Sequence, residues 1–427
     1  MRLTLVSLKM LSNYTCALDI SSSKVSAAVA KIKKKRITNI FFETKSPSKG
    51  MKKGAIVDSI DLTGSIGRTL KNLKAKSGIN IKFIYINISG LDIVTKHSRA
   101  IIPLAERGNK VITLSDIQQV NEQARILGSS LEEEIIHQIA HNYVIDSNSN
   151  ILNPLGLYSH RLEVELYLVC AKSSFIQGLN RAVNQAGYEI KDLFLSGLAT
   201  SQAVFNKGLK EGMTILCDIG SDITELLLFR DGILKDVEIL PIGGDDLTIE
   251  LSEKLKTSFD LAEDVKMSYG SVSDYNQMHN DKEILIKQNN AYKPINQRSV
   301  SEILTPKAKL ICQAIRAAVE KIVPCEEVDN FVTTGRTVLL EGFLEMLENS
   351  LGISVKLGRI TNPNIISWVN KDNTISGQKY LTYITSLGII CQALYQPKPE
   401  IISNYQPTQN PILNTINKFK EIYQEYF

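Results

Sequence analysis

The chain has 427 residues, of which 43% are hydrophobic and 22% are charged. This balance excludes fibrous, low-complexity and wholly membrane-embedded proteins, and the length predicts two or more domains, because single cores stop growing at roughly 250 to 300 residues. A net charge of +4 from 49 basic and 45 acidic residues is too small over this length to indicate a nucleic-acid partner. The six cysteines are scattered without a Cys-x-x-Cys pair, which is typical of a reduced, cytoplasmic protein.

The first predicted element is a β-hairpin over residues 15–32, in which apolar and polar residues alternate. Asp19 ends its first strand, and three serines at 21–23 form the turn. Such a turn can direct successive backbone N–H groups at an anion, while a strand-end carboxylate can hold a hydrated divalent cation. Taken alone, the segment is interpreted as an ordinary hairpin. A dense basic run at 31–36 is interpreted as a solvated turn, with membrane or nucleic-acid contact as alternatives.

A helix is predicted over residues 63–77 from its apolar periodicity. Residues 91–169 then have the pattern of a small inserted unit. It contains a strand at 93–102, a helix that begins near Thr113, and an extended return at 162–169. Thr113 or Ser115 can cap the first turn of that helix.

The pattern of the first hairpin returns at residues 213–229. Asp218 ends the strand there, and Gly220 and Ser221 begin the turn. Two copies at matching places predict two lobes of similar plan, each with one phosphate-binding turn, which a single copy would not indicate.

Two later places could also approach a nucleotide. Gly243 and Gly244 lie between a strand and a helix, where they permit a close pass by a nucleotide or by the opposite lobe. Glu263 and Lys266 lie three residues apart and share a helix face. They form either a surface ion pair or a contact to a ribose or base. The polar stretch at 271–299 is predicted to be a mobile loop or an irregular subdomain edge.

A helix is predicted over residues 306–323. Gly335 and Arg336 follow, between a strand at 328–332 and a helical segment at 339–347. A glycine turn between a strand and a helix can bring the backbone against a nucleotide, although such a loop is common in its own right.

Several short motifs therefore follow one another in order along the chain. They are the Asp19 turn, Gly50-x-x-x-Gly54-x-Ile56-x-Asp58, Ser89-Gly90, Asn153-Pro154-Leu155-Gly156-Leu157 with Arg161-Leu162-Glu163, the Asp218 turn, Ile242-Gly243-Gly244-Asp245, Ala262-Glu263-x-x-Lys266-x-x-x-Gly270, Thr334-Gly335 and Ser386-Leu387-Gly388. Each is weak alone, but their order and spacing over residues 13–427 resemble the FtsA family of bacterial cell-division proteins, within the actin and Hsp70 superfamily.

The resemblance implies an α/β, actin-like two-lobed fold with an FtsA-type inserted subdomain and a C-terminal amphipathic helix. The expected parts are a first lobe at 13–90 and 170–200, the inserted subdomain at 91–169, a second lobe at 201–247 and 329–396, a second-lobe subdomain at 248–328, a linker at 397–411 and the amphipathic helix at 412–427.

The resemblance also implies ATP and Mg²⁺ as cofactors in the cleft, with Asp19 and Asp218 holding the metal. The implied nucleotide contacts are Asp19, Ser21, Ser22, Ser23, Lys24, Asp218, Gly220, Ser221, Gly243, Gly244, Glu263, Lys266, Gly335 and Arg336. The implied partners are the FtsZ C-terminal peptide at 248–328, further copies in a filament, late divisome membrane proteins, and the membrane surface. The implied function is to polymerise and to tether FtsZ filaments to the inner face of the cytoplasmic membrane at the division site.

The chain departs from the family pattern in all three turns. Ser21 replaces a glycine of the first turn, Asp222 and Ile223 replace a glycine and a threonine of the second, and Arg336 stands where a second glycine is usual. Arg336 either crowds the adenine edge or supplies a cation. A carboxylate about 4 Å from a phosphate charge repels it by roughly 4 kcal/mol at an effective dielectric of about 20, unless a cation or a turned-away side chain relieves it. At most a weak ATPase is expected, and the sequence identifies no catalytic residue.

Residues 412–427 have the pattern of an amphipathic helix behind a proline-containing linker. Membrane-surface binding is the favoured interpretation, and docking on the protein's own body or on a partner helix are the alternatives. Two lysines are balanced by two glutamates, so attraction to anionic lipid is weak. The residues that would enter the membrane are Ile412, Leu413, Ile416, Phe419, Ile422, Tyr423, Tyr426 and Phe427.

Two other functions stay open at this stage. A small-molecule kinase of the same superfamily would need a catalytic carboxylate that faces a substrate pocket, and the sequence places none convincingly. An actin-like scaffold for pilus assembly would lack the terminal amphipathic helix.

Overall fold

The computed structural model describes residues 14–395, apart from 35, 46–47, 49, 106–107, 147, 273–282, 289–290 and 370–376. The expected linker at 397–411 and the expected helix at 412–427 lie outside the described residues. Among the helices that are described, none is long and apolar enough to cross a bilayer.

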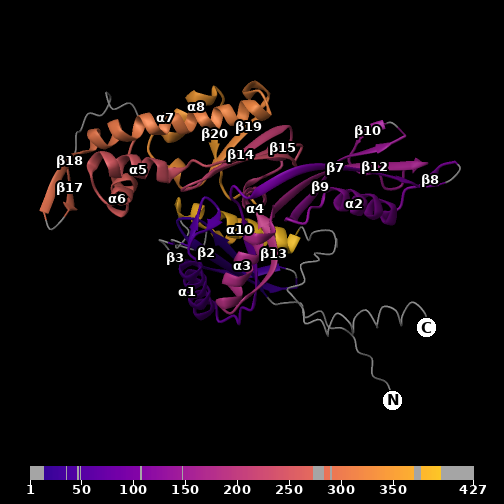
Figure 1. The fold of residues 1–427 in the computed structure, drawn as a ribbon, viewed down its shortest axis with the longest axis horizontal. Coiled ribbons are helices and arrows are strands. Elements are labelled where there is room, and N and C mark those ends of the chain that lie inside the picture. Colours follow the sequence, from indigo (N-terminus) through magenta and orange to yellow (C-terminus); the bar gives the residue numbers. More distant parts are fainter. Residues whose placement is uncertain are drawn as a thin grey trace, which may run out of the picture. The chain divides into compact units, whose positions relative to one another are not determined.

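Two five-stranded sheets of the same topology form the frame of the fold (Figure 1). The first has the order β13-β6-β1-β2-β3, and the second has the order β20-β19-β14-β15-β16. In each, a three-stranded antiparallel meander is extended by two parallel strands. The two lobes of similar plan are therefore confirmed. The strands are β1 (Tyr14–Ile20), β2 (Val25–Lys33), β3 (Arg36–Lys45), β6 (Phe83–Ile88), β13 (Glu189–Leu195), β14 (Met213–Ile219), β15 (Thr224–Arg230), β16 (Ile233–Leu240), β19 (Asn330–Thr334) and β20 (Val355–Leu357).

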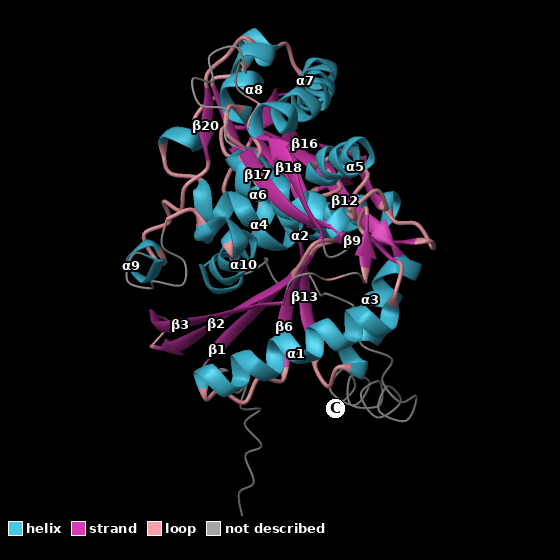
Figure 2. Ribbon diagram, turned by 90° about the vertical axis from the view of Figure 1, so that its left-hand side faces the viewer, coloured by secondary structure: helices cyan, strands magenta, loops and turns pink. Residues whose placement is uncertain are grey.

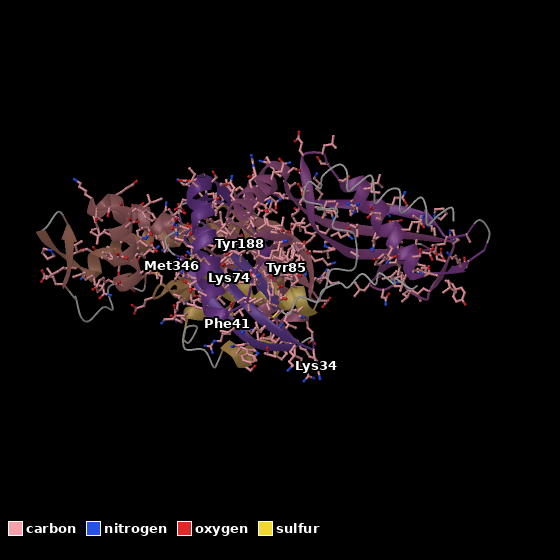
Figure 3. All side chains as sticks on the ribbon, turned by 90° about the horizontal axis from the view of Figure 1, so that it is seen from below. Lys34, Phe41, Lys74, Tyr85, Tyr188 and Met346 are labelled. Atoms are coloured by element: carbon pink, nitrogen blue, oxygen red, sulfur yellow. The ribbon has the colours of Figure 1, made fainter. Side chains whose placement is uncertain are left out.

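The basic run forms the connection between β2 and β3. Lys33, Lys34 and Arg36 are exposed, and Lys34 projects from the tip of the hairpin (Figure 3). This arrangement agrees with a solvated turn, because all three charges stay in water.

One face of the first sheet is covered by α1 (Ser59–Ser77) and α3 (Ser173–Gln185) (Figure 2). The helix α1 begins at Asp58, whose carboxylate accepts the backbone N–H groups of Ile60 and Asp61, and ends at Gly78, which has a φ of 67°. Its buried apolar residues recur at helical spacing and face the sheet: Leu62, Ile66, Leu70 and Leu73.

The opposite face of the first sheet packs on α4 (Ser196–Val204) and α10 (Ile384–Tyr395). These two helices pack closely together, and α4 also contacts β14 and β15 of the second sheet, so one apolar cluster includes Ala17 of β1, Leu387 of α10 and Leu227 of β15. The helix α10 contacts β1, β2 and β6 of the first sheet. The apolar residues of α10 complete the core of the first lobe.

The inserted unit is a four-stranded antiparallel sheet with one helix on its face (Figure 1). Thr113 caps its helix through a reciprocal capping box with Asp116, as the sequence indicates. The long central strand β9 was not predicted, because histidines and glutamine interrupt its apolar pattern. The elements are β7 (Ile93–Pro103), β8 (Lys110–Val111), α2 (Leu114–Gly128), β9 (Glu133–Ile145), β10 (Asn148–Ile151), β11 (Tyr158–Ser159) and β12 (Arg161–Lys172).

The polar stretch at 271–299 contains more regular structure than the predicted loop. Ile284 and Ile295 are buried cross-strand partners in the hairpin of β17 (Glu283–Gln288) and β18 (Ala291–Asn296), and a helix begins directly afterwards. That helix is α7 (Gln297–Ile322), which begins nine residues before the predicted start at Pro306 and contains this proline in its interior. The other helices around the second sheet are α5 (Gly244–Leu255), α6 (Phe259–Tyr269) and α8 (Phe343–Leu351); the short elements are β4 (Met51–Lys52), β5 (Ala55–Ile56) and α9 (Ile366–Val369).

Candidate functional site

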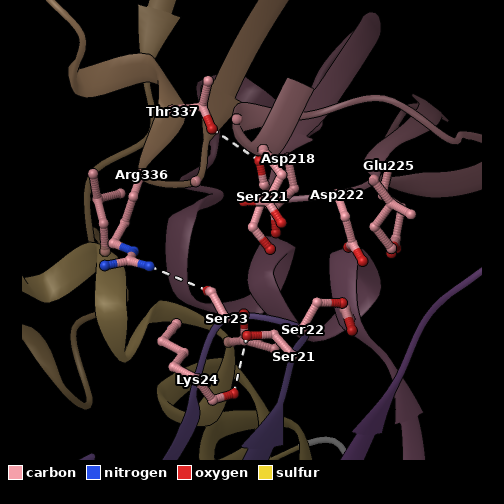
Figure 4. Close-up of a pocket in the computed structure, with 18 of the residues that line it drawn as sticks. Ser21, Ser22, Ser23, Lys24, Asp218, Ser221, Asp222, Glu225, Arg336 and Thr337 are labelled. Atoms are coloured by element: carbon pink, nitrogen blue, oxygen red, sulfur yellow. Dashed lines mark hydrogen bonds between the residues drawn. The ribbon is translucent and has the colours of Figure 1, made fainter. Parts of the chain in front are cut away.

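A cavity of about 330 Å³ lies between the two sheets and has a volume within the range of small-molecule sites. Its walls come from the β1–β2 turn, the β14–β15 turn, the starts of α4 and α5, one face of α6, and the turn after β19 (Figure 4). Except for Gly243, all the expected nucleotide contacts line it: Asp19, Ser21, Ser22, Ser23, Lys24, Asp218, Gly220, Ser221, Gly244, Glu263, Lys266, Gly335 and Arg336.

The first turn is fixed by an internal ion pair. The Nζ of Lys24 lies 3.2 Å from Oδ2 of Asp19, and Ser26 Oγ donates to the same oxygen at 3.2 Å. Lys24 Nζ also donates to the carbonyl oxygen of Thr382 at 2.5 Å. Lys24 therefore pairs with Asp19 and anchors the segment before α10.

The second turn is closed by backbone hydrogen bonds. The N–H of Gly220 donates to the carbonyl of Ile223 at 3.0 Å, and the N–H of Gly244 donates to the carbonyl of Gly220 at 3.0 Å. A Cβ on Gly243 would lie 2.6 Å from the carbonyl oxygen of Ser221. At Gly243 the close approach is therefore made by the backbone of the second turn and not by a ligand. For this reason Gly243 does not line the cavity.

The two predicted metal ligands interact electrostatically. Loss of contact with bulk water and the nearby Asp19 carboxylate raise the pKa of Asp218 to about 6. A hydrated Mg²⁺ is usually bound by one or two carboxylates together with substrate phosphates, so this donor pair fits that ion and would be relieved of repulsion by it. Throughout the described ranges there is no group of three or more His, Cys, Asp or Glu side chains arranged for a metal.

Glu263 and Lys266 form an ion pair, but it lies in the cavity wall. Lys266 is 7% exposed, and its Nζ lies 2.6 Å from Oε2 of Glu263. The same Nζ donates to the carbonyl of Gly244 at 2.9 Å and to Thr248 Oγ1 at 2.7 Å. Lys266 thereby joins α6 to the start of α5, and the Glu263 carboxylate stays at the cavity.

The turn after β19 needs a glycine. Gly335 has a φ of +91°, and a Cβ there would overlap the carbonyl oxygen of Ile219 and lie 2.8 Å from Oδ1 of Asp218. The next residue, Arg336, reaches across the cavity, where its Nη2 donates to Ser23 Oγ at 3.1 Å (Figure 4).

Asp222 points away from the second turn. Its carboxylate accepts the backbone N–H of Lys53, in the β4–β5 hairpin of the first lobe. The side chain is 7% exposed. The position that departs most from the family pattern therefore carries a contact between the lobes.

Glu225 is a cavity residue that the sequence reasoning missed. It is 3% exposed, and its carboxylate accepts the N–H of Gly197 at 2.7 Å and the hydroxyl of Ser89. The hairpin register could have identified Glu225 from the sequence, because the four-residue turn places it directly opposite Asp218. Like charges in that arrangement repel. Asp245, which the sequence placed in a motif without assigning it to the site, is a second carboxylate of the cavity lining, and partial burial raises its pKa to about 6.

Glu225→Gln is expected to raise the free energy of unfolding at about pH 8 and to change it little at about pH 5. Burial raises the pKa of Glu225 from 4.5 to about 7, so between these values the folded state holds a proton that the unfolded state has lost. Stability from this group is complete below the lower value and is lost as the pH rises through the higher one. The difference corresponds to roughly 3 kcal/mol at most. Urea denaturation at several pH values would show it, and parallel pH curves for the two proteins would contradict it.

Two family models match the chain, and together they cover more than half of it. The model described as "Cell division protein FtsA" matches residues 215–384, and the model of the SHS2 domain inserted in FtsA matches residues 90–170, the inserted unit. The FtsA of Pseudomonas aeruginosa is 26% identical over 349 residues, which are 80% of this chain and 82% of that protein. The FtsA of Bacillus subtilis is 26% identical over 376 residues, covering 88% and 82% of the two chains.

Solved structures support the fold. A chain of a PilM–PilN type IV pilus biogenesis complex superposes with a TM-score of 0.62 at 14% identity, covering 89% of this chain and 98% of that one. MreB5 of Spiroplasma citri bound to ADP superposes with a TM-score of 0.50 at 10% identity, covering 84% and 95%. The fold is therefore actin-like, as expected. With both family models in sequence order and the relatives matched over most of their length, the chain belongs to the FtsA family of cell-division proteins.

Proposed function

We propose that this protein binds ATP with Mg²⁺ in the cavity between its lobes, assembles with further copies, and tethers FtsZ filaments to the inner face of the cytoplasmic membrane. The observation that carries the nucleotide part is the pair of strand-end carboxylates, Asp19 and Asp218, each followed by a small-residue turn on one cavity. The ADP in the similarly folded MreB5 supports the same class of ligand.

Calorimetric titration of the full chain with ATP, with and without Mg²⁺, tests the nucleotide part. Saturable binding that weakens when EDTA removes the metal is expected, because the cation screens Asp19 and Asp218 from the phosphates. A phosphate-release assay on the same sample would measure turnover, which is expected to be slow or absent. No heat of binding at high protein concentration would reject the nucleotide proposal.

The membrane part rests on the sequence of residues 412–427, with its apolar and polar residues at helical spacing. A chain that ends at Asn410 is expected to stay in solution when the full chain sediments with liposomes. Equal sedimentation of both chains would remove the membrane assignment. We further propose that the FtsZ C-terminal peptide binds at 248–328 and that late divisome proteins bind the inserted subdomain. Fluorescence anisotropy of the labelled FtsZ peptide, titrated with the full chain, tests the first of these two proposals.

For the pilus-assembly alternative, this chain shares only its fold with the chain of the PilM–PilN complex. Both family models that match the chain are those of FtsA. For the kinase alternative, the described cavity supplies carboxylates, but Glu225 and Asp222 are both engaged by protein donors. The first function is therefore the one we propose.

A further inference from the structure

The first lobe presents two hydrogen-bond donors to the second lobe from one braced unit. Lys53 lies in the tight β4–β5 turn with a φ of 50°, and its carbonyl accepts the N–H of Leu91 at 3.4 Å. The following Gly54 packs so closely on Gly90 that a Cβ on either would overlap the other's backbone. The turn is thereby fixed against the β6–β7 connection, which carries Ser89. The N–H of Lys53 and the hydroxyl of Ser89 are held by the same piece of structure.

Both donors are used by carboxylates of the second lobe. Asp222 accepts from the Lys53 N–H, and Glu225 accepts from the Ser89 hydroxyl. Both carboxylates are almost fully buried. A buried acceptor that loses its donor has no water to replace it, so each of these two bonds favours the arrangement in which the lobes are in contact.

A further contact between the lobes lies on the opposite side of the cavity. Arg336 extends from the turn after β19 to Ser23 in the first-lobe turn (Figure 4). The other two cationic side chains of the described cavity lining, Lys24 and Lys266, each pair with a carboxylate of their own lobe. Among the described lining residues, Arg336 is the cation that bridges the lobes.

We propose that Asp222, Glu225 and Arg336 form an interlobe clasp, which holds the two lobes closed through contacts within the chain itself. A ligand can shift an equilibrium between open and closed forms only by its difference in affinity for the two. Where the clasp already favours the closed form, a nucleotide can shift the equilibrium between the open and closed forms only slightly. This last consequence rests on the proposed nucleotide binding, whereas the clasp itself does not.

Hydrogen exchange at the amide of Lys53 tests the clasp, because this N–H is one of its bonds. Mass spectrometry of the full chain would follow peptides that cover residues 50–56, without nucleotide and with saturating Mg-ATP. In the unmodified protein the amide is expected to be protected in both conditions. In Asp222→Ala it is expected to exchange about tenfold to a hundredfold faster without nucleotide, in line with the loss of a charge-assisted bond.

Two further variants separate the clasp from a general loss of structure. Asp222→Asn keeps an acceptor oxygen without the charge and should give an intermediate exchange rate. Glu238→Gln removes a carboxylate that pairs with Lys321 outside the cavity, so it should leave the Lys53 amide unchanged. Protected amides of α1 in every variant would show that the first lobe stays folded. If Asp222→Ala does not fold, the exchange rate of the Lys53 amide in Asp222→Asn decides the test instead.

The clasp is overturned if the Lys53 amide of the unmodified protein exchanges as fast as that of Asp222→Ala, or if it becomes protected only after Mg-ATP is added. A failure of the proposed function is a separate result, because it would appear as an absence of nucleotide binding in calorimetry. The exchange comparison without nucleotide would then still decide on the clasp.

Discussion

Asp218→Asn is expected to weaken binding of Mg-ATP by about tenfold to a hundredfold and to abolish the effect of Mg²⁺ on the affinity. The carboxylate of Asp218 is one of the two strand-end groups that face the cavity, and its pKa of about 6 leaves it largely ionised at neutral pH. Without its charge, the carboxylate of Asp19 alone would remain to hold the cation.

The same substitution should not harm the protein without nucleotide. Asp218 lies opposite Glu225 on the neighbouring strand, and its pKa is raised partly by Asp19. Replacing one of these charges relieves repulsion, so the thermal midpoint should stay the same or rise. Glu238→Gln, a carboxylate outside the cavity, is the control and should keep the Mg²⁺ effect. An Asp218→Asn protein with unchanged Mg²⁺-dependent affinity would remove Asp218 from the metal site.

Gly388→Ala is expected to lower the free energy of unfolding by about 3 kcal/mol or more. Gly388 lies in α10, where it packs against α4 so closely that a Cβ would overlap the carbonyl oxygen of Ala199 and lie 2.5 Å from its carbonyl carbon. A backbone carbonyl cannot turn aside as a flexible side chain can, so the two helices would have to separate.

Gly67→Ala is a matched control for this prediction. Gly67 is inside α1, and its added Cβ would find its nearest neighbour, the Cβ of Ala186, at 3.9 Å. Alanine in a helix interior is more favourable than glycine by roughly 0.5 to 1 kcal/mol, so this variant should gain stability. Chemical denaturation of both variants measures the effects. Equal midpoints for Gly388→Ala and the unmodified protein would show that the contact between α4 and α10 is looser than the structure indicates.

The site was largely predictable because local patterns determine it. A strand that ends in an aspartate and reverses through small residues occurs twice, and the two turns meet because each opens a sheet of the same topology. Glu225 could have been found by the same reasoning, since a four-residue turn determines which residue faces Asp218. The pairing of Asp222 with Lys53 could not, because these residues are 169 positions apart and belong to different lobes.

Two elements of the fold were mispredicted because tertiary packing overrides the local pattern. The hairpin of β17 and β18 lies within a mainly polar stretch, and its strands are supported by the cross-strand pair of Ile284 and Ile295. The early start of α7 was hidden by Pro306, which the helix includes in its interior. Proline is common in the first turn of a helix, so the sequence predicts that this helix begins at Pro306.

The position of α10 has a consequence for folding during synthesis. This helix covers the face of β1 and β2, yet it is the last described element of the chain. While a ribosome is making the protein, the first sheet must therefore wait for residues 384–395 before the face of β1 and β2 is covered. The second sheet is complete once β20 has been made, at residue 357. The half of the molecule that is synthesised later can thus finish folding earlier, and chains that stop before residue 384 would expose an apolar sheet face for chaperones and proteases to bind.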